Sequence, residues 1–247
     1  MKNKIVVSVI TTTFQHPKLM LDRAIESVRV QKGVEYEHIV IDDTHTKNGM
    51  MKTYQKAFYR CSGDYIAFCD GDDYWCSDDK LKRQVDYMNS NPDCGLCITR
   101  VYSERGVTWW DSPPADYVNG NMSFDALLKG TAPIHAQSYL LRKSDFDKYI
   151  DFDFFVNNFN TWDYPTVLEL IKHAKIHCLD FYSAVNVINE ESVTHTRNRV
   201  KRLKYIIGTY KIKWYYIKKY GCKLSTAFYL IYRAVRHIYS IGGKRWT

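Results

Sequence analysis

The chain has 247 residues, of which 45% are hydrophobic and 25% are charged. This composition is typical of a globular protein and excludes a disordered, collagen-like or small disulfide-stapled protein. No apolar run approaches the roughly 18–20 residues of a membrane-spanning helix, and the run at residues 5–10 is too short for the core of a signal peptide. We therefore expect a cytoplasmic protein whose seven cysteines are reduced thiols.

The formal net charge of +8 is distributed unevenly along the chain. Residues 192–247 hold fourteen Lys and Arg and no Asp or Glu, which leaves 21 basic and all 27 acidic residues, a net charge of −6, in residues 1–191. The pattern predicts an acidic body, residues 1–191, followed by a basic tail, residues 192–247.

Strands and helices alternate in the first hundred residues. Short apolar runs predict strands at residues 4–10, 36–41, 63–69 and 95–101. Apolar residues three or four positions apart predict helices at residues 21–30 and 77–89, the second capped by Ser77 or Asp78. A strand, a helix and a strand joined by short links indicate a βαβ unit, and hence a parallel sheet.

The elements that follow are shorter. Residues 103–122 lack periodicity and are rich in Gly, Pro, Trp, Asp and Asn, which predicts a loop over the front of the sheet. Beyond this loop we predict helices at residues 123–128 and 166–173, and strands at residues 136–141 and 175–186. Cys94 and Cys97 have the spacing of zinc ligands, but no second pair lies nearby, so we interpret them as part of a buried strand.

Aspartates follow two of the predicted strands. Asp42 and Asp43 follow the second strand, and Asp70, Asp72 and Asp73 follow the third. Ligands of an open α/β sheet bind beyond the carboxyl ends of its strands, although an aspartate there can equally cap the next turn. Three carboxylates within four residues repel one another unless a cation joins them, and Mg²⁺ and Mn²⁺ bind through one or two carboxylates plus substrate phosphates. The second cluster therefore predicts a metal–diphosphate site.

At this point the sequence resembles the family 2 glycosyltransferases of the GT-A fold, over roughly residues 5–196. The resemblance rests on residues 7–14 (VSVITTTF), 40–43 (VIDD), 63–75 (GDYIAFCDGDDYW), 80–84 (KLKRQ), 163–165 (DYP) and 191–195 (ESVTH). It implies a Rossmann-like, mostly parallel central sheet with a nucleotide-sugar-binding half at about residues 1–100 and an acceptor half at about residues 101–191. It also implies an inverting hexosyltransferase with a UDP- or dTDP-linked donor and Mn²⁺ or Mg²⁺ as cofactor.

The resemblance gives roles on the donor side to four residues. Thr12 and Phe14 would line the nucleobase pocket, and Asp43 would hydrogen-bond the imide of a uracil or thymine. Asp72 would face the donor ribose or sugar. Because the segment at residues 44–62 is about half of the family's usual length, we expect one helix–strand pair beside the nucleotide site to be missing.

The resemblance also names metal ligands and a base. Asp73 would hold the metal that bridges the two phosphates, with Asp70 as a supporting carboxylate. His195 would reach the diphosphate or the metal, although a lone histidine is more often structural. Asp163 would be the general base that takes the proton of the acceptor hydroxyl; the alternative is that it only caps the helix whose first turn contains Pro165.

The basic tail predicts two amphipathic helices that meet near Gly221, the second capped by Ser225. Eleven of its 56 residues are aromatic. Its apolar faces can pack on the body, while its lysines beside Trp and Tyr are typical of a helix that lies in a membrane interface. The two interpretations are compatible.

The combined prediction is a glycosyltransferase that is peripheral on the inner face of a bacterial cell membrane. Its acceptor would be a saccharide or a lipid-linked saccharide of a surface glycan. Two alternatives stay open: a non-catalytic sugar-nucleotide-binding protein, which the short segment at residues 44–62 suggests, and a nucleic-acid-binding protein that uses the basic tail. The acidic body argues against the second.

Overall fold

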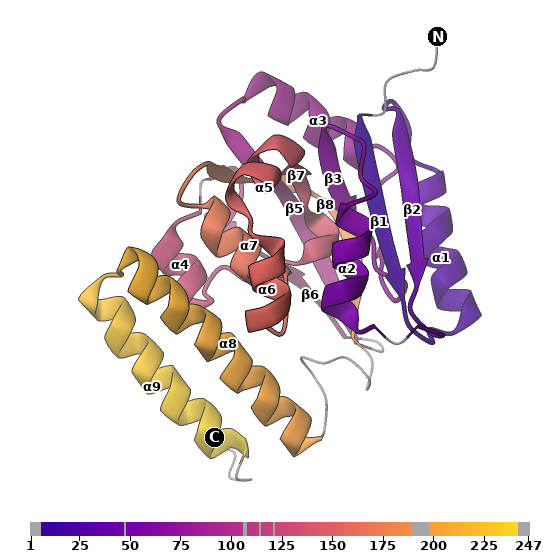
Figure 1. Cartoon of the computed structure of the whole chain (residues 1–247). Helices are drawn as coiled ribbons and strands as arrows, with labels where there is room; N and C mark the ends of the chain where they lie inside the picture. Colours follow the sequence, from indigo (N-terminus) through magenta and orange to yellow (C-terminus); the bar gives the residue numbers. More distant parts are fainter. Residues whose placement is uncertain are drawn as a thin grey trace.

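The computed structural model describes residues 6–46, 48–105, 108–113, 115–120, 122–188 and 198–241 (Figure 1). The strands of this part of the chain are β1 (Val7–Thr13), β2 (Tyr36–Asp42), β3 (Tyr65–Phe68), β4 (Tyr74–Trp75), β5 (Cys94–Arg105), β6 (Thr108–Ser112), β7 (Leu140–Arg142) and β8 (Lys175–Val187). The helices are α1 (Lys18–Arg29), α2 (Met50–Phe58), α3 (Lys80–Ser90), α4 (Phe124–Lys129), α5 (Lys143–Tyr149), α6 (Phe152–Asn158), α7 (Asp163–Leu170), α8 (Arg199–Tyr220) and α9 (Leu224–Ile241).

The strands form one eight-stranded sheet in the order β2-β1-β3-β7-β5-β8-β4, and β6 pairs with β5 outside this path. Parallel pairing joins β1 to β2 and β3, and β5 to β8, whereas β7, β6 and β4 pair antiparallel with their neighbours. Five strands, β1, β2, β3, β5 and β8, therefore share one direction. The predicted mostly parallel, Rossmann-like sheet is confirmed.

Two hydrophobic cores lie on opposite faces of this sheet, because successive side chains of a strand point to opposite faces. Val9 of β1 and Ala67 of β3 pack in the core that is shared with α1 and α3. Their neighbours Ile10 and Phe68 pack in the other core, which is shared with α2 and with helices α4 to α9. The sheet is thus covered by helices on both sides, and its strand ends remain available to a ligand.

Several predicted boundaries are wrong. The strand predicted at residues 4–10 continues through the threonines to Thr13, since β2 pairs along its whole length. The predicted loop at residues 103–122 is wrong in its first half, where β5 and β6 form an antiparallel hairpin. Cross-strand hydrogen bonds decide this pairing, and a short mixed sequence carries no period that would reveal it. Helices α2, α5 and α6 and strand β4 are not among the predicted elements either.

Both predicted helix caps are wrong by one or two residues. Helix α3 has Asp79 at its N-cap position, and Ser77 instead donates a hydrogen bond to the Asp79 carboxylate at 2.5 Å. Helix α9 begins at Leu224, before Ser225, and Thr226 donates to the carboxylate of Asp125 at 2.5 Å. In each case a contact with another residue displaces the cap expected from local sequence.

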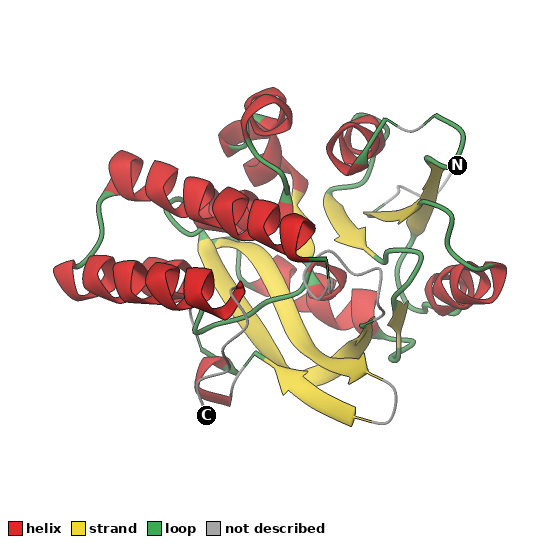
Figure 2. Ribbon diagram, turned by 90° about the horizontal axis from the view of Figure 1, so that it is seen from below, coloured by secondary structure: helices red, strands yellow, loops and turns green. Residues whose placement is uncertain are grey.

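The tail forms the two predicted helices, which lie side by side at one end of the molecule (Figures 1 and 2). Ile212, Tyr216 and Leu230 are buried in the same core as α7, so the tail packs on the body as one of the two interpretations requires. No helix within the described residues has the length and apolar character needed to cross a membrane. All seven cysteines are free thiols, and the buried Cys94 and Cys97 lie on β5, as predicted.

Candidate active site

The carboxyl ends of β1, β2 and β3 meet at one edge of the sheet, and the predicted donor-side residues gather there. The backbone N–H of Gly71 donates to the Thr12 carbonyl at 2.9 Å, and that of Asp43 donates to the Thr13 carbonyl at 2.9 Å. These bonds hold both acidic segments against the end of β1. A Cβ atom on Gly71 would lie 2.7 Å from Nδ1 of His16 and 3.2 Å from the Thr12 carbonyl oxygen, so a larger residue would require the His16 ring to move.

Asp70 receives two hydrogen bonds at the inner end of the cluster. The Thr12 hydroxyl donates to Oδ1 at 2.7 Å, and the Tyr54 hydroxyl donates to the same oxygen. Burial of the carboxylate, followed by the negative charge of Asp72, nevertheless raises the pKa of Asp70 to about 6. The donors only partly compensate for the missing solvent.

Asp73, like Asp70, is a carboxylate largely shielded from solvent, and 7% of its surface is exposed. Its Oδ1 accepts the backbone N–H of Val187 at 2.8 Å, which ties the cluster to the end of β8. Burial, and then repulsion from Asp72 and Asp70, raise the pKa of Asp73 well above its usual value. In the buried Asp73 and the partly buried Asp70, burial and the neighbouring carboxylates thus both disfavour the ionised form.

This cluster of carboxylates fits a divalent cation. No three His, Cys, Asp or Glu side chains within the described ranges are arranged to hold a metal by themselves. A hard cation that takes one or two carboxylates, together with diphosphate oxygens of a ligand, needs no such trio. Asp70 and Asp73 suit that arrangement. His195, the third predicted ligand, lies outside the described residues.

The residues that the sequence predicts to contact the nucleobase differ in their accessibility to a ligand. Phe14 follows β1 and is 48% exposed, so its ring is accessible for stacking. Asp43 is buried by its own loop: Oδ1 accepts from the Thr46 hydroxyl at 2.5 Å and from the Asn48 N–H at 2.9 Å, and Oδ2 accepts from the Gly49 N–H at 2.8 Å. Although burial opposes it, these bonds hold the pKa of Asp43 well below its usual value. Hydrogen bonds from its own loop thus occupy the carboxylate oxygens of Asp43 that the resemblance assigns to a contact with the nucleobase.

Tyr54 of α2 belongs to the site and is not among the predicted residues. It is 1% exposed, its hydroxyl donates to Asp70, and its ring centroid lies 4.6 Å from that of Trp162. Burial first, then Asp70, and to a smaller extent Asp163, raise the pKa of Tyr54 well above its usual value. The helical spacing of Met51, Tyr54 and Phe58 could have revealed an inward face in the short segment.

Asp163 is the first residue of α7 and directly follows the buried Trp162. The Thr161 hydroxyl donates to its carboxylate, which fixes the orientation of that carboxylate. The charges of Asp163 and Asp70 both act on the Tyr54 hydroxyl, so the fold brings the predicted base and the acidic cluster near the same tyrosine.

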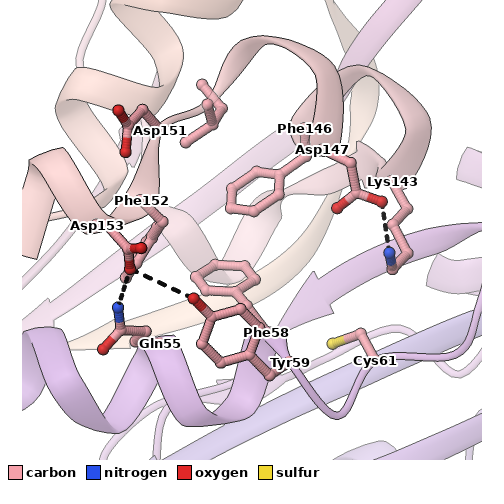
Figure 3. A pocket seen from close by; sticks show the side chains of 11 residues that line it. Gln55, Phe58, Tyr59, Cys61, Lys143, Phe146, Asp147, Asp151, Phe152 and Asp153 are labelled. Atoms are coloured by element: carbon pink, nitrogen blue, oxygen red, sulfur yellow. Dashed lines mark hydrogen bonds and ion pairs between the residues drawn. The ribbon is translucent and has the colours of Figure 1, made fainter.

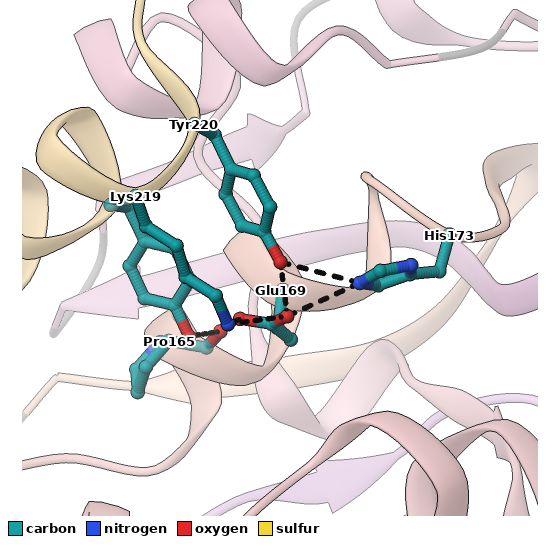
Figure 4. Close-up of polar contacts among 6 residues, drawn as sticks. Pro165, Glu169, His173, Lys219 and Tyr220 are labelled. Carbon is teal, nitrogen blue, oxygen red and sulfur yellow. Dashed lines mark hydrogen bonds and ion pairs between the residues drawn. The ribbon is translucent and has the colours of Figure 1, made fainter.

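Helix α7 is held at its other end by the tail (Figure 4). Lys219 donates to both oxygens of the buried Glu169, at 2.9 and 2.8 Å, and Tyr220 and His173 also contact this carboxylate. Burial would raise the pKa of Glu169, but these contacts outweigh it and the pKa lies below its usual value. The Tyr216 hydroxyl donates to the Pro165 carbonyl at 2.9 Å, near Asp163. The tail therefore anchors the helix that carries the predicted base.

A separate cleft of about 380 Å³ lies between α2, α5 and α6 (Figure 3). None of the predicted site residues lines it. Its charged groups are engaged locally: Lys143 pairs with Asp147 at 2.5 Å, and Asp153 accepts from Gln55 at 2.5 Å. Its polar groups thus satisfy one another, and the chemistry described above lies elsewhere.

The model of glycosyl transferase family 2 matches residues 44–150. Two uncharacterized proteins, from Mycobacterium tuberculosis and Mycobacterium bovis, are each 34% identical over 85 residues, which is 34% of this chain and 24% of theirs. This chain thus matches about a quarter of the length of those relatives. An uncharacterized glycosyltransferase of Methanocaldococcus jannaschii is 25% identical over 215 residues, 73% of this chain and 74% of that protein.

Solved structures match the fold. Staphylococcus aureus TarS in complex with UDP-GlcNAc has a TM-score of 0.59 at 13% identity, covering 82% of this chain and 64% of that one. The mannosyltransferase PcManGT of Pyrobaculum calidifontis, in complex with GDP-Man and Mn²⁺, has a TM-score of 0.58 at 12% identity, covering 100% and 77%. The predicted GT-A fold and the resemblance to family 2 glycosyltransferases are confirmed.

Proposed function

We propose that this protein transfers a sugar, with inversion, from a UDP- or dTDP-linked donor to a saccharide or lipid-linked saccharide acceptor. The observation that carries the proposal is the cluster of carboxylates formed by the partly buried Asp70, the neighbouring Asp72 and the buried Asp73, at the edge of the sheet where ligands of such folds bind. A divalent cation with a nucleoside diphosphate would neutralise this charge.

Asp73 would hold Mn²⁺ or Mg²⁺, with Asp70 in support and Asp72 toward the donor ribose or sugar. When bound, the metal would stabilise the negative charge that develops on the diphosphate leaving group. Thr12 and Tyr54 would keep the Asp70 carboxylate in place through their hydrogen bonds. The complexes of TarS with UDP-GlcNAc and of PcManGT with GDP-Man and Mn²⁺ support this class of donor and cofactor.

The nucleobase would lie against Phe14 and Thr12. Because the oxygens of Asp43 accept hydrogen bonds from its own loop, its contact with a uracil or thymine imide requires one of those bonds to be exchanged. Selection of UDP or dTDP over GDP is therefore the part of the proposal that most needs a direct measurement.

Asp163 would act as general base. Its carboxylate would accept the proton of the acceptor hydroxyl while that oxygen attacks the anomeric carbon on the side opposite the diphosphate. One displacement from the opposite side inverts the configuration at that carbon. Thr161 would orient the carboxylate through its hydrogen bond, so that a basic oxygen faces the acceptor.

A thermal-shift screen tests the donor assignment. UDP, dTDP and GDP, free and sugar-linked, would be compared with and without Mn²⁺. A ligand at a hundred times its Kd adds about 2.7 kcal/mol of stability, so we expect a clear rise in Tm with UDP or dTDP that depends on Mn²⁺. A preference for GDP would contradict the donor assignment.

Release of free UDP or dTDP from the stabilising sugar nucleotide, measured by chromatography, then distinguishes an enzyme from a non-catalytic binding protein. Stabilisation without release in the presence of saccharide and lipid-linked acceptors would favour the binding protein.

A further inference from the structure

The tail carries exposed apolar side chains on both of its helices. We define the tail stripe as Val200, Leu203, Ile207, Trp214, Leu224, Phe228, Ile231, Tyr232 and Val235. Large side chains of this kind are ordinarily covered, and here Trp214 is 45% and Phe228 is 64% exposed. Scattered exposed apolar residues need no explanation, whereas a contiguous set marks an interaction surface.

Helical geometry places the stripe positions of each tail helix on one side of that helix. At about 100° per residue, the four stripe positions of α8 fall within about 60° of one another, and the five of α9 within about 100°. The buried Ile212 and Tyr216 of α8 and the buried Leu230 of α9 lie on the opposite sides of their helices. Each helix therefore has two apolar faces, one packed on the protein and one directed outward.

The charge around the tail stripe is of one sign. The exposed basic residues are Lys201, Lys204 and Lys218 of α8, Lys223 between the two helices, and Arg236 of α9. Residues 192–247 contain no acidic side chain. Two copies that met through this surface would bring like charges together, which disfavours a dimer. A nucleic acid would use the cations but would gain little from exposed Val, Leu and Ile. Apolar side chains with Trp and Tyr between lysines suit a lipid–water interface.

A groove of about 370 Å³ adjoins the tail stripe where α8 crosses the segment that follows α6. Ile207 of the stripe lines it together with Phe159, Asn160, Lys204 and Lys211. An apolar wall with lysines and an amide at its margin matches the chemistry of an anionic lipid headgroup at the start of its acyl chains. The groove thus continues the apolar surface and adds cations to it.

From these observations we propose that α8 and α9 dock on a lipid bilayer that carries anionic headgroups. The tail stripe enters the interface, and the exposed Lys and Arg beside it face the headgroups. Not every lysine of the tail takes part, since Lys213 is 9% exposed and Lys219 is bound to Glu169. The docking is independent of the proposed transfer reaction, because it requires neither donor nor acceptor.

The test is co-sedimentation of the full chain with vesicles of phosphatidylcholine alone or mixed with phosphatidylglycerol. The stripe variant replaces Ile207, Trp214, Phe228 and Ile231 with Gln. The matched control replaces Leu19, Val40, Met50 and Tyr59, which are exposed apolar residues of the body, with Gln. A charge variant replaces Lys201, Lys204 and Lys218 with Gln.

We expect the wild type and the control to bind the phosphatidylglycerol vesicles. The stripe variant should bind at least about tenfold more weakly, because its apolar contacts are lost. The charge variant should bind about a hundredfold more weakly, from about 1 kcal/mol per lysine near an anionic surface. Thermal melts should be unchanged in all variants, because the replaced side chains are exposed.

Four results would overturn the proposal. They are a wild type that stays in the supernatant with anionic vesicles, a stripe variant that binds as the wild type does, a stripe variant that melts at a much lower temperature, and a wild-type dimer that the stripe substitutions dissociate. The last would identify the surface as an interface between copies. Binding to an oligonucleotide with no binding to vesicles would likewise count against a membrane and favour a nucleic acid.

Discussion

Asp43 and Asp73 look alike in the sequence and differ in the structure. Each follows a strand of the same sheet, and they are similarly buried, at 5% and 7% exposure. Asp43 accepts hydrogen bonds from three residues of its own loop, whereas Asp73 accepts one backbone N–H and faces other carboxylates. The pKa of Asp43 consequently lies well below its usual value, and that of Asp73 well above it.

The difference separates a carboxylate that supports its own loop from one that we propose to bind a ligand. A buried charge that its own loop satisfies contributes to folding and has little capacity for a further partner. A buried charge that faces like charges destabilises the ligand-free protein and gains most when a cation arrives. The same residue type at equivalent positions can therefore support folding at one strand end and binding at the next.

Asp73→Asn tests the carboxylate of this pair that we propose to bind a ligand, and its expected result is complete loss of the metal dependence. The substitution should abolish the Mn²⁺-dependent stabilisation by UDP or dTDP, about 2.7 kcal/mol at a hundred times Kd. It should leave the ligand-free protein at least as stable, because it removes a repelling charge and no core atom. Thermal melts with and without Mn²⁺ measure both effects, and Asp86→Asn on the exposed face of α3 is the control. An unchanged Mn²⁺ requirement would show that Asp73 does not hold the metal.

Asp163→Asn should retain the stabilisation by donor and lower the turnover about 10²–10⁴-fold, because an amide cannot accept the acceptor proton. Initial rates of nucleotide release, together with donor-dependent Tm shifts, separate these quantities. Turnover near that of the wild type with a lowered Tm would instead assign Asp163 to the start of α7 as a cap.

The metal-free protein should lose stability as the pH rises from about 4 to about 6. Asp70 has a pKa of about 6 in the folded state against an ordinary value of 3.8, so the folded state binds the extra proton in this window. Stability contributed by that proton, up to about 3 kcal/mol, is lost as the pH rises through the folded pKa. The free energy of unfolding would be measured in urea with EDTA for the wild type and for Asp70→Asn. The difference between the two values at each pH isolates the effect of Asp70. A difference that is flat between pH 4 and pH 7 would contradict it.

Asp43→Asn should have the smallest effect. The pH dependence of the Asp43 contribution to stability should also run opposite to that of Asp70. We expect a loss of about 2 kcal/mol of unfolding free energy at pH 7, because an amide nitrogen would replace an oxygen that accepts backbone N–H groups. Since the pKa of Asp43 is lowered by folding, its contribution is present above about pH 4 and fades as the pH falls further. Equal stability of the variant and the wild type at pH 7 would mean that the loop does not depend on this carboxylate.

Apart from α2 and β4, the sequence by itself determined the order of strands and helices in the first hundred residues, the acidic strand ends and the two helices of the tail. These features depend on local properties: the apolar period of a segment, the residues that end it and its net charge. The predicted site residues of the described chain accordingly lie where the parallel strands end, apart from Asp163. The position of Asp163 beyond Tyr54 depends on how α7 packs.

Tertiary structure alone decided which carboxylates have hydrogen-bond partners and which residues those partners are. Tyr54 reaches Asp70 across 16 residues, Lys219 reaches Glu169 across 50, and the Val187 N–H reaches Asp73 across 114. No local period encodes such pairs, because each depends on how distant segments pack. For the same reason β6 was predicted as a loop, and the contact of Lys219 with Glu169 was not predicted. Hydrophobic patterning places the elements, and the burial of polar groups among residues distant in sequence then sets their chemistry.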